Sequence, residues 1–440
     1  MKNNISVLGL GKSGISAANL AVKLGNSVFA SDVGKTKKLE NLNKKVSVEL
    51  GGCHSDKILS SNIIIKSPGL CPDISILKKA QSKKIQILSE LSFALLNSKY
   101  RKIIAVTGTN GKTTTADLIS KIIKSEHKNS IVVGNIGIPL SDKALKTTKD
   151  TYITMELSSY QLEDSPNFKA NISVLLNITP DHLNHHKTMR AYIKSKQNIF
   201  VNQTKNDFLV VNYDDKICAN LAKKAKSRVI FFSKKPLKSG VFYNDGKIVI
   251  QIDKKHFQIE PRINIVGMHN IENILASFAA TYVAGIHLKS IEKIISKYKG
   301  VPHRIEFVKA INGVSYYNDS KATNVDSTRV ALESFDKNIN LIMGGQDKGV
   351  PYTPLKQLIK KKVKAVFLIG EASNKIKKDL RGASTFFDSK SLEQALRQAY
   401  MNSKDGDIVL FSPACASFDS FTNFEERGNI FKSLVNKLGK

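Results

Sequence analysis

Residues Ile103–Thr115 read IIAVTGTNGKTTT, and this stretch decides the fold class of the chain. An apolar run leads into a Gly-rich turn, Lys112 and Thr113 follow, and a helical pattern continues over 116–123. The order predicts a strand, a phosphate-binding loop and a helix, in which backbone N–H groups at a helix N-terminus bind an anion. Lys112 would contact the β- and γ-phosphates, and the Thr113 hydroxyl would reach Mg²⁺. Val106 stands where the general phosphate-loop pattern has its first glycine, so an ordinary Gly-rich turn is the alternative.

Length and composition are typical of a multidomain globular protein. The 440 residues suggest about three domains, and 41% hydrophobic and 24% charged residues are ordinary proportions. No apolar run is long enough to span a bilayer, and we expect no membrane partner. The first residues read better as a strand than as a signal peptide, because 11–14 interrupt the apolar run. Four scattered cysteines without a C-x-x-C pair indicate a reducing cytoplasm and no structural zinc.

The formal net charge is +31. Such a charge is compatible with a nucleic-acid partner, but the lysines are spread over the whole chain and no Arg-rich block interleaved with aromatics accompanies them. We therefore expect a lysine-rich solvated surface that also favours anionic substrates, and no nucleic-acid partner.

The N-terminal segment carries a G-x-G-x-x-G pattern at residues 9–14, between a predicted strand at 5–8 and a predicted helix at 15–24. A second strand at 27–30 leads to Asp32, which is the usual context of a dinucleotide site. Taken alone, the pattern predicts an oxidoreductase, yet the same geometry binds any diphosphate. A further strand at 63–65 ends in Ser67-Pro68-Gly69, which is either part of the same crevice or a plain turn.

The middle of the chain predicts a parallel sheet, with strands that end at Glu156 and before Asp181 and His182. Working residues of such sheets follow the carboxyl ends of strands, and Thr113, Glu156 and His182 all do. Glu156 is a candidate Mg²⁺ ligand or a helix cap. From 208 to 260 the pattern becomes β-rich and indicates a small antiparallel excursion.

Residues 181–186 read DHLNHH and contain several possible metal ligands. His182 and His186 are four apart and would share a face if this stretch were helical, which makes zinc a rival to Mg²⁺. No third ligand is evident, so a solvated histidine cluster stays open. Lys196 by itself would be interpreted as a surface lysine.

The last third again alternates strands and helices. Polar loops follow the strands at 314–317, 340–343 and 407–411, and we expect them to share one edge of a sheet. They offer Thr323, Lys348 and Ser417, which suit a carboxylate-bearing small molecule. Cys415 has no evident partner histidine, so a packed thiol is favoured over a nucleophile.

The loop 108–113 and the segment 412–428 resemble the Mur ligase family, and the resemblance runs over essentially the whole chain. It implies an α/β fold of three domains: a Rossmann-like domain at 1–92 that binds a UDP-sugar, a P-loop ATPase-like domain at 93–299, and a Rossmann-like domain at 300–440 that binds an amino acid. Within the family, the likeness implies ATP-dependent addition of D-glutamate to UDP-N-acetylmuramoyl-L-alanine through an acyl phosphate, in peptidoglycan precursor synthesis. We expect ATP and Mg²⁺ as cofactors, a monomer and a cytoplasmic location.

The resemblance also implies roles for individual residues. Lys112, His182 and Lys196 would be catalytic, and Lys196 matches a lysine that the family carries as a carbamate, which reverses its interpretation as a surface lysine. The implied metal ligands are Thr113, Glu156, His182 and Lys196. The implied ATP contacts are Gly108, Thr109, Asn110, Gly111, Lys112, Thr113, Thr114, Asn270, Asn273, Arg304 and Asp319. The implied UDP-substrate contacts are Gly11, Ser13, Gly14, Asp32, Ser67, Gly69 and Asn135. The implied D-glutamate contacts are Thr323, Lys348, Ser417 and Phe424.

Three other functions remain open at this point. A sister amide ligase, such as another Mur ligase or a folylpolyglutamate synthase, is the nearest, although the N-terminal G-x-G-x-x-G domain argues against the folate enzyme. A nicotinamide-dependent oxidoreductase is disfavoured by the second phosphate loop. A nucleotide-binding regulator would bind the ligands without releasing phosphate.

Overall fold

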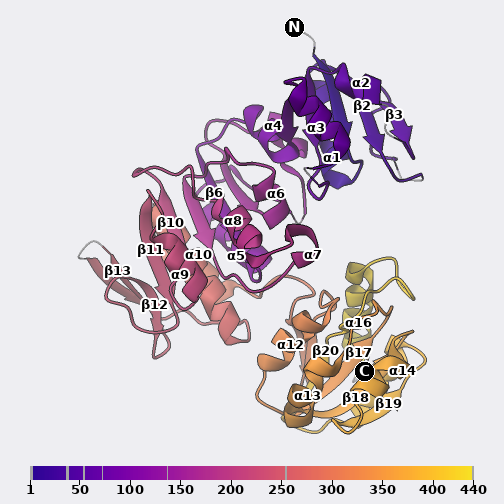
Figure 1. The fold of residues 1–440 in the computed structure, drawn as a ribbon. Helices are drawn as coiled ribbons and strands as arrows, with labels where there is room; N and C mark the ends of the chain where they lie inside the picture. The colour runs from indigo at the N-terminus through magenta and orange to yellow at the C-terminus, as the bar shows by residue number, and fades with distance from the viewer. Residues whose placement is uncertain are drawn as a thin grey trace. The chain divides into compact units, whose positions relative to one another are not determined.

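The computed structural model describes residues 3–35, 39–52, 55–71, 73–135, 137–252 and 255–438, and Cys53 lies outside them. These residues form three sheets (Figure 1). By contacts, the chain divides into two compact units, Met1–Pro261 with Ile271–Ile295, and Arg262–Asn270 with Ser296–Lys440. The first unit holds two of the sheets and the second unit holds the third. Among the described residues, no helix has both the length and the apolar character to cross a membrane.

The N-terminal sheet is parallel throughout, with strand order β3-β2-β1-β4-β5. Its strands are β1 (Asn4–Leu8), β2 (Ser27–Asp32), β3 (Ser47–Leu50), β4 (Ile63–Lys66) and β5 (Gln86–Ser89). Its helices are α1 (Lys12–Lys23), α2 (Ser55–Leu59), α3 (Ser75–Ser82) and α4 (Glu90–Leu96). Along β4, Ile65 packs in a cluster with α1 while its neighbour Ile64 packs with α2 and α3, so helices cover both faces of the sheet. This is the doubly covered arrangement that the sequence predicts.

Helix α1 begins three residues earlier than the sequence suggests, at Lys12 rather than Ile15. The cause is the close approach of the glycine loop to the helix. A Cβ atom at Gly14 would lie 1.8 Å from the Gly9 carbonyl oxygen and 2.6 Å from Ser67 Oγ. Only glycine therefore allows the first turn of α1 to pack directly on the loop.

The central sheet has nine strands in the order β14-β13-β12-β11-β10-β9-β6-β8-β7. They are β6 (Lys102–Thr107), β7 (Ser130–Gly134), β8 (Tyr152–Glu156), β9 (Ile172–Leu175), β10 (Phe208–Asn212), β11 (Arg228–Ser233), β12 (Gly240–Asn244), β13 (Lys247–Ile252) and β14 (Lys255–Ile259). The helices around it are α5 (Lys112–Lys124), α6 (Ser159–Glu163), α7 (Leu183–His186), α8 (Met189–Gln197), α9 (Lys216–Ala222), α10 (Met268–Ala284) and α11 (Leu288–Lys297), with short 3₁₀ turns η1 (Leu140–Asp142) and η2 (Ala144–Lys146).

The region 208–260 differs from the expected antiparallel excursion. β10 and β11 pair in parallel with their neighbours and extend the main sheet, with α9 between them. Only β12, β13 and β14 form an antiparallel meander at its edge. The prediction was wrong for the first two strands, because α9 is only seven residues long and leaves a weak helical signal between them.

The third sheet has the order β15-β16-β20-β17-β18-β19, with only β15 antiparallel to its neighbour. Its strands are β15 (Glu306–Ile311), β16 (Val314–Asn318), β17 (Ile339–Gly344), β18 (Val363–Ile369), β19 (Thr385–Asp388) and β20 (Ile408–Phe411). Its helices are α12 (Val325–Glu333), α13 (Lys356–Lys362), α14 (Ser373–Asp379), α15 (Leu392–Met401) and α16 (Phe424–Lys437), with η3 (Thr353–Leu355). Leu341 and Ile342, adjacent in β17, belong to separate apolar clusters, so this sheet is also covered on both faces.

Within the first unit, buried polar contacts join the N-terminal sheet to the central one. Lys66, at the end of β4, donates to Asp164 at 2.5 Å, and both side chains are 5% exposed. Glu90 accepts from the backbone N–H and the hydroxyl of Ser141. Burial raises the pKa of Asp164, while the Lys66 ammonium opposes that rise. The ion pair therefore offsets part of the cost of burying the Asp164 carboxylate where the two sheets meet.

We expect Lys66→Met to lower the free energy of unfolding by about 3–5 kcal/mol, because it leaves the Asp164 carboxylate buried without its partner. The matched control is Lys121→Met, which breaks the exposed Lys121–Asp117 pair and should cost only about 0.3–0.5 kcal/mol. Urea unfolding of the full chain measures both. Equal losses in the two variants would contradict the assigned role of the buried pair.

Candidate active site

The phosphate-type loop joins β6 to α5, as the sequence predicts. Gly111 has φ +83°, and a Cβ atom there would lie 2.2 Å from Asn273 Oδ1. A Cβ atom at Gly108 would lie 2.9 Å from Leu176 Cβ. Both positions therefore require glycine, one for its backbone angle and both for space.

The N-terminus of α5 has the electrostatics of an anion site. No side chain caps the helix, and its first turn has no acidic residue. Lys112 folds back over the loop, and its Nζ donates to the carbonyl oxygens of Gly108 at 3.0 Å and Thr109 at 2.7 Å. Thr113 is half-buried and Thr114 is buried in the same turn, while Asn110 is exposed. Backbone N–H groups and one ammonium group thus converge where an anion would bind.

Thr113, Glu156 and His182 lie at or beyond the ends of three adjacent strands, because β6, β8 and β9 are neighbours in the sheet. Glu156 ends β8, is 2% exposed, and accepts from Asn135 Nδ2 at 3.2 Å. Asn135 follows β7 and is exposed. The sheet therefore presents the Glu156 carboxylate at the same edge as the phosphate-type loop.

Lys196 is fully buried in α8, so its interpretation as a surface lysine is wrong. Its side chain is directed at the loop, where Nζ donates to the Gly108 carbonyl oxygen at 2.8 Å, and it lies 4.8 Å from the ring centre of Tyr192. Burial, together with the nearby Lys112 ammonium, lowers the pKa of Lys196 well below its usual value. The position beside the loop thus favours the uncharged form of the Lys196 amine.

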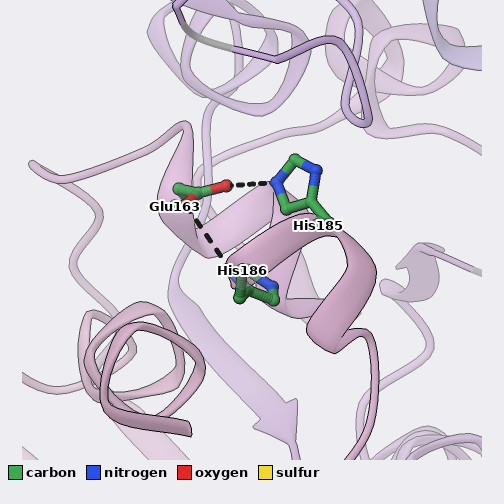
Figure 2. A group of neighbouring side chains, drawn as sticks. All are labelled: Glu163, His185 and His186. Carbon is green, nitrogen blue, oxygen red and sulfur yellow. Dashed lines mark hydrogen bonds and ion pairs between the residues drawn. The ribbon is translucent and has the colours of Figure 1, made fainter. Parts of the chain in front are cut away.

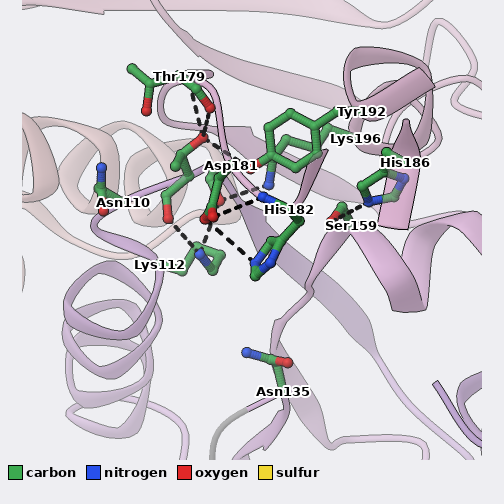
Figure 3. A network of polar contacts seen from close by, with 12 residues as sticks. Asn110, Lys112, Asn135, Ser159, Thr179, Asp181, His182, His186, Tyr192 and Lys196 are labelled. Atoms are coloured by element: carbon green, nitrogen blue, oxygen red, sulfur yellow. Dashed lines mark hydrogen bonds and ion pairs between the residues drawn. The ribbon is translucent and has the colours of Figure 1, made fainter. Parts of the chain in front are cut away.

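His182 faces the same region, and Figure 3 shows its ring with Asp181, Lys112 and Lys196. It stands at the N-cap of α7 with φ +53°. Burial lowers the pKa of His182, and the Lys112 and Lys196 charges act in the same direction against Asp181. His182 is therefore a neutral imidazole, able to offer a lone pair to a metal.

His182 and His186 do not form the four-apart pair that the sequence suggested for zinc. Helix α7 is only four residues long and begins after His182, whose left-handed backbone sends the ring toward the loop. His186 is buried on the other side, with Nε2 2.9 Å from Ser159 Oγ (Figure 3).

The G-x-G-x-x-G loop is closed by its own side chains. Asp32 accepts from the backbone N–H of Leu10 at 2.6 Å and of Gly34 at 2.8 Å. Ser67 Oγ donates to the Gly9 carbonyl oxygen at 2.7 Å. Gly11 and Gly69 are exposed, Ser13 is half-buried and Gly14 is buried. Asp32 and Ser67 thus hold the shape of the loop, and the exposed glycines leave backbone open to a ligand.

In the second unit, the three polar loops lie side by side as expected, because β16, β20 and β17 are adjacent. A bridge between Gln346 and Ala416 joins two of them directly. Ser417 is buried, Thr323 is half-buried and Lys348 is exposed. Phe424 opens α16, and its carbonyl oxygen accepts from Ser320 Oγ at 2.9 Å.

Arg427 is a structural residue to which the sequence analysis assigned no role. It is 1% exposed and donates to the carbonyl oxygens of Ser320, Cys415 and Ala416 and to Ser320 Oγ. Burial lowers the pKa of Arg427 to about 10, so its guanidinium stays charged at neutral pH. One side chain thereby fixes two of the polar loops. The signal was an arginine in the quoted 412–428 segment, but one of its partners, Ser320, is 107 positions away in sequence.

Cys415 is a packed thiol, as favoured from the sequence. It is buried with Sγ 3.0 Å from the Tyr352 hydroxyl, and burial raises the pKa of its thiol to about 11. A thiol that keeps its proton is a poor nucleophile.

The expected adenosine contacts are distributed over both units. Asn273 belongs to the first unit and its Oδ1 accepts from Thr115 Oγ1 at 3.3 Å. In the second unit, Asn270 Nδ2 donates to the Val266 carbonyl oxygen at 2.6 Å, and Arg304 is half-buried. Asp319 accepts from Ser412 Oγ at 2.7 Å and from the Ile305 N–H at 3.2 Å.

Three family models match the chain. They are the MurD-like N-terminal domain of Mur ligases over residues 3–89, the Mur ligase middle domain over 106–281, and the Mur ligase glutamate ligase domain over 303–415. The UDP-N-acetylmuramoylalanine–D-glutamate ligase of Elusimicrobium minutum is 45% identical, covering 98% of this chain and 97% of its own. The ligase of the same name from Clostridioides difficile is 40% identical, covering 99% and 98%.

Solved structures with the same fold are more distant in sequence. The MurF ligase of Thermotoga maritima in complex with ADP has a TM-score of 0.62 at 17% identity, covering 99% of this chain and 96% of its own. The MurC ligase of the same organism has a TM-score of 0.61 at 18% identity, covering 99% of both chains. At these identities, the likeness shows the fold alone.

We expect Asp319 to make stability depend on pH, because burial raises the pKa of its carboxyl to about 7. Between about pH 4 and pH 7 the folded chain keeps a proton that the unfolded chain has lost, so the free energy of unfolding falls as pH rises through that window. Asp319→Asn should remove this fall. Melting temperatures at pH 5 and pH 8 test it, since the difference between variant and parent should become more favourable to the variant at the higher pH.

The control is Asp326→Asn, whose side chain is 86% exposed, and its difference from the parent should stay nearly constant over the same range. An Asp319→Asn difference that does not change between the two pH values would contradict the assignment.

Proposed function

The chain belongs to the Mur ligase family, and we propose that it joins D-glutamate to UDP-N-acetylmuramoyl-L-alanine at the expense of ATP, in peptidoglycan precursor synthesis. The observation that carries this function is the 45% identity over 98% of the chain to a ligase of that name. The phosphate-type loop and the three polar loops of the third sheet agree with it.

The reaction has two steps. The substrate carboxylate attacks the γ-phosphorus of ATP, the bond to the bridging oxygen of ADP breaks, and an acyl phosphate forms. The amine of D-glutamate then attacks the acyl carbon, phosphate leaves, and the amine loses a proton as the amide forms. Little of this requires covalent chemistry from the protein, so catalysis is mainly positioning and charge stabilisation.

The phosphate loop supplies that stabilisation. The N–H groups at the start of α5 and the Lys112 ammonium bind the phosphates, and Gly108, Thr109, Asn110, Gly111, Thr113 and Thr114 form the surrounding loop. Lys112 is already directed over the loop by the Gly108 and Thr109 carbonyls. An ammonium group fixed before the reaction stabilises developing negative charge without reorganisation.

The proposed site also binds Mg²⁺. The residues that would hold the ion are Thr113, Glu156, His182 and Lys196. The buried Glu156 carboxylate and the Thr113 hydroxyl suit a hard cation, and His182 is held neutral. When bound, Mg²⁺ neutralises phosphate charge and orients the phosphates.

Lys196 fits this set only as a carbamate. A neutral amine adds CO₂ and releases one proton, which turns a nitrogen base into an oxygen ligand. The lowered pKa of Lys196 favours the neutral amine, and the adjacent Lys112 ammonium would stabilise the anionic product. Burial, the Gly108 contact and the neighbouring cation support the modification together.

The remaining sites are proposed on the residues expected from the sequence. Gly11, Ser13, Gly14, Asp32, Ser67, Gly69 and Asn135 form the UDP-substrate site. Asn270, Asn273, Arg304 and Asp319 contact the adenosine part of ATP, and Thr323, Lys348, Ser417 and Phe424 bind D-glutamate. We also propose domain boundaries near residues 92 and 299, a monomer, and a cytoplasmic location.

Phosphate release tests the function. The protein is incubated with ATP, Mg²⁺ and UDP-N-acetylmuramoyl-L-alanine, and D-glutamate, L-glutamate and other amino acids are compared. Release should require both the UDP substrate and D-glutamate. Release with a different amino acid would indicate a sister ligase, and ligand binding without release would indicate a regulator.

Lys196→Ala tests the carbamate. Loss of a group that only supports a metal ligand costs about 10–100-fold in activity, so loss of the ligand itself should cost at least as much. Added formate or acetate should restore part of the activity by occupying the space of the carbamate. Lys194→Ala, an exposed position of the same helix, is the control and should change little. A Lys196→Ala variant as active as this control would refute the role.

A further inference from the structure

A second group of potential metal ligands lies outside the phosphate loop. Glu163 ends α6, and His185 and His186 lie in α7 (Figure 2). His185 Nε2 is 2.7 Å from one carboxylate oxygen of Glu163, and His186 Nδ1 is 3.6 Å from the other. The three ligand atoms all lie within 4.8 Å of one another. The set supplies the third ligand that the sequence around 181–186 lacks.

His186 carries a buried nitrogen that a cation could satisfy. Its side chain is fully buried, Nε2 is bonded to Ser159 Oγ at 2.9 Å, and Nδ1 has no hydrogen-bond partner. A buried polar atom without a partner costs free energy. When Nε2 donates to Ser159, the Nδ1 lone pair faces the Glu163 carboxylate, and two acceptors then oppose each other across 3.6 Å.

The surroundings of His186 favour the form of its imidazole that binds metal. Burial lowers the pKa of His186, with Glu163 opposing and His185 assisting, so the imidazole is neutral. The ring of Tyr160 packs against His185 at 4.4 Å and His186 at 5.5 Å between centroids and fixes both rings. The Ser159 contact is the kind of outer hydrogen bond that orients a metal-bound histidine.

We propose that Glu163, His185 and His186 bind a divalent transition-metal ion of the Zn²⁺ class and thereby fasten α7 to α6. Two imidazole nitrogens and one carboxylate are a common zinc ligand set, whereas Mg²⁺ prefers oxygen. Tetrahedral zinc with bonds of about 2.1 Å places its ligand atoms about 3.4 Å apart. The three ligand atoms lie within 4.8 Å of one another, so binding would bring them together by at most about 1.4 Å. Side chains of His185 and Glu163 are 16% and 30% exposed, so an ion and a water ligand can enter.

The site is distinct from the proposed Mg²⁺ site and does not depend on the ligase function. It shares no residue with the set of Thr113, Glu156, His182 and Lys196. An ion bound at this site would still affect the proposed Mg²⁺ ligands, because it would fix α7 and His182 is the N-cap of α7.

Equilibrium dialysis of the metal-free full-length protein against Zn²⁺ tests the site. Saturating Mg²⁺ and ADP are present to occupy the phosphate-loop region. The parent should retain one Zn²⁺ per chain, and Glu163→Gln and His185→Gln should each bind at least tenfold more weakly. His256→Gln, an exposed histidine on β14, should bind as the parent does. His182→Gln should also keep its Zn²⁺, which separates this site from the neighbouring one.

Co²⁺ gives an independent readout, since its visible absorption reports a low-coordinate site with nitrogen ligands. The absorption should appear with the parent and His256→Gln and be lost in His185→Gln. Far-ultraviolet circular dichroism checks folding, and His185→Asn replaces any variant that fails it. No retained Zn²⁺ in the parent, or equal retention in Glu163→Gln, His185→Gln and the parent, would overturn the proposal. Loss in His182→Gln alone would place the ion at the phosphate loop and overturn it as well.

Discussion

The carbonyl oxygen of Gly108 accepts from two lysines, Lys112 at 3.0 Å and Lys196 at 2.8 Å, and the region around the phosphate-type loop depends on this shared contact. Two ammonium groups cannot both stay charged at one buried acceptor, because repulsion adds to the loss of solvation. Lys196 is fully buried, and burial together with the Lys112 ammonium lowers its pKa well below the usual value, so proton loss is favoured at Lys196. The contact also requires glycine at 108, since a Cβ atom there would press on Leu176.

The sequence was sufficient to predict those elements that depend only on residues near one another in the chain. The strand, Gly-rich turn and helix at 103–124, the strand at 152–156 and the three polar loops of the third sheet could all be predicted. The burial of Lys196 could not be predicted from the local pattern. Most residues next to it in sequence are polar, and its side chain is buried against the loop at 108, which is 88 positions away. The suggested pair of His182 and His186 failed for another reason. His182 has a left-handed backbone and precedes a helix of only four residues, so the two side chains diverge. So short a helix leaves no periodic pattern in the sequence.

The contacts of Arg427 in the second unit could not be predicted from the local sequence either. Its charge suggests an exposed residue or a ligand contact, yet its guanidinium donates hydrogen bonds to carbonyl oxygens of the two loops that follow β16 and β20. Neighbouring strands bring those loops side by side, but only a multidentate donor in α16 fixes their distance. The shape of this edge is therefore set by a residue outside both loops, 107 positions from Ser320 in the first of them, and a pattern within either loop could not reveal it.

Two adjacent acids at the end of the short helix α6 make separate contacts. Asp164, directly after α6, is paired with Lys66 and holds the N-terminal sheet, while Glu163 faces His185 and His186 of α7. Five helical residues are too few to be stable by themselves, so α6 owes its position to these contacts and to its Ser158–Gln161 capping box. A metal ion at Glu163 would add a third fixed point on the same segment. Because Lys66 precedes Ser67, which contacts the glycine loop, and α7 follows His182, one short helix would then position both the glycine loop and His182.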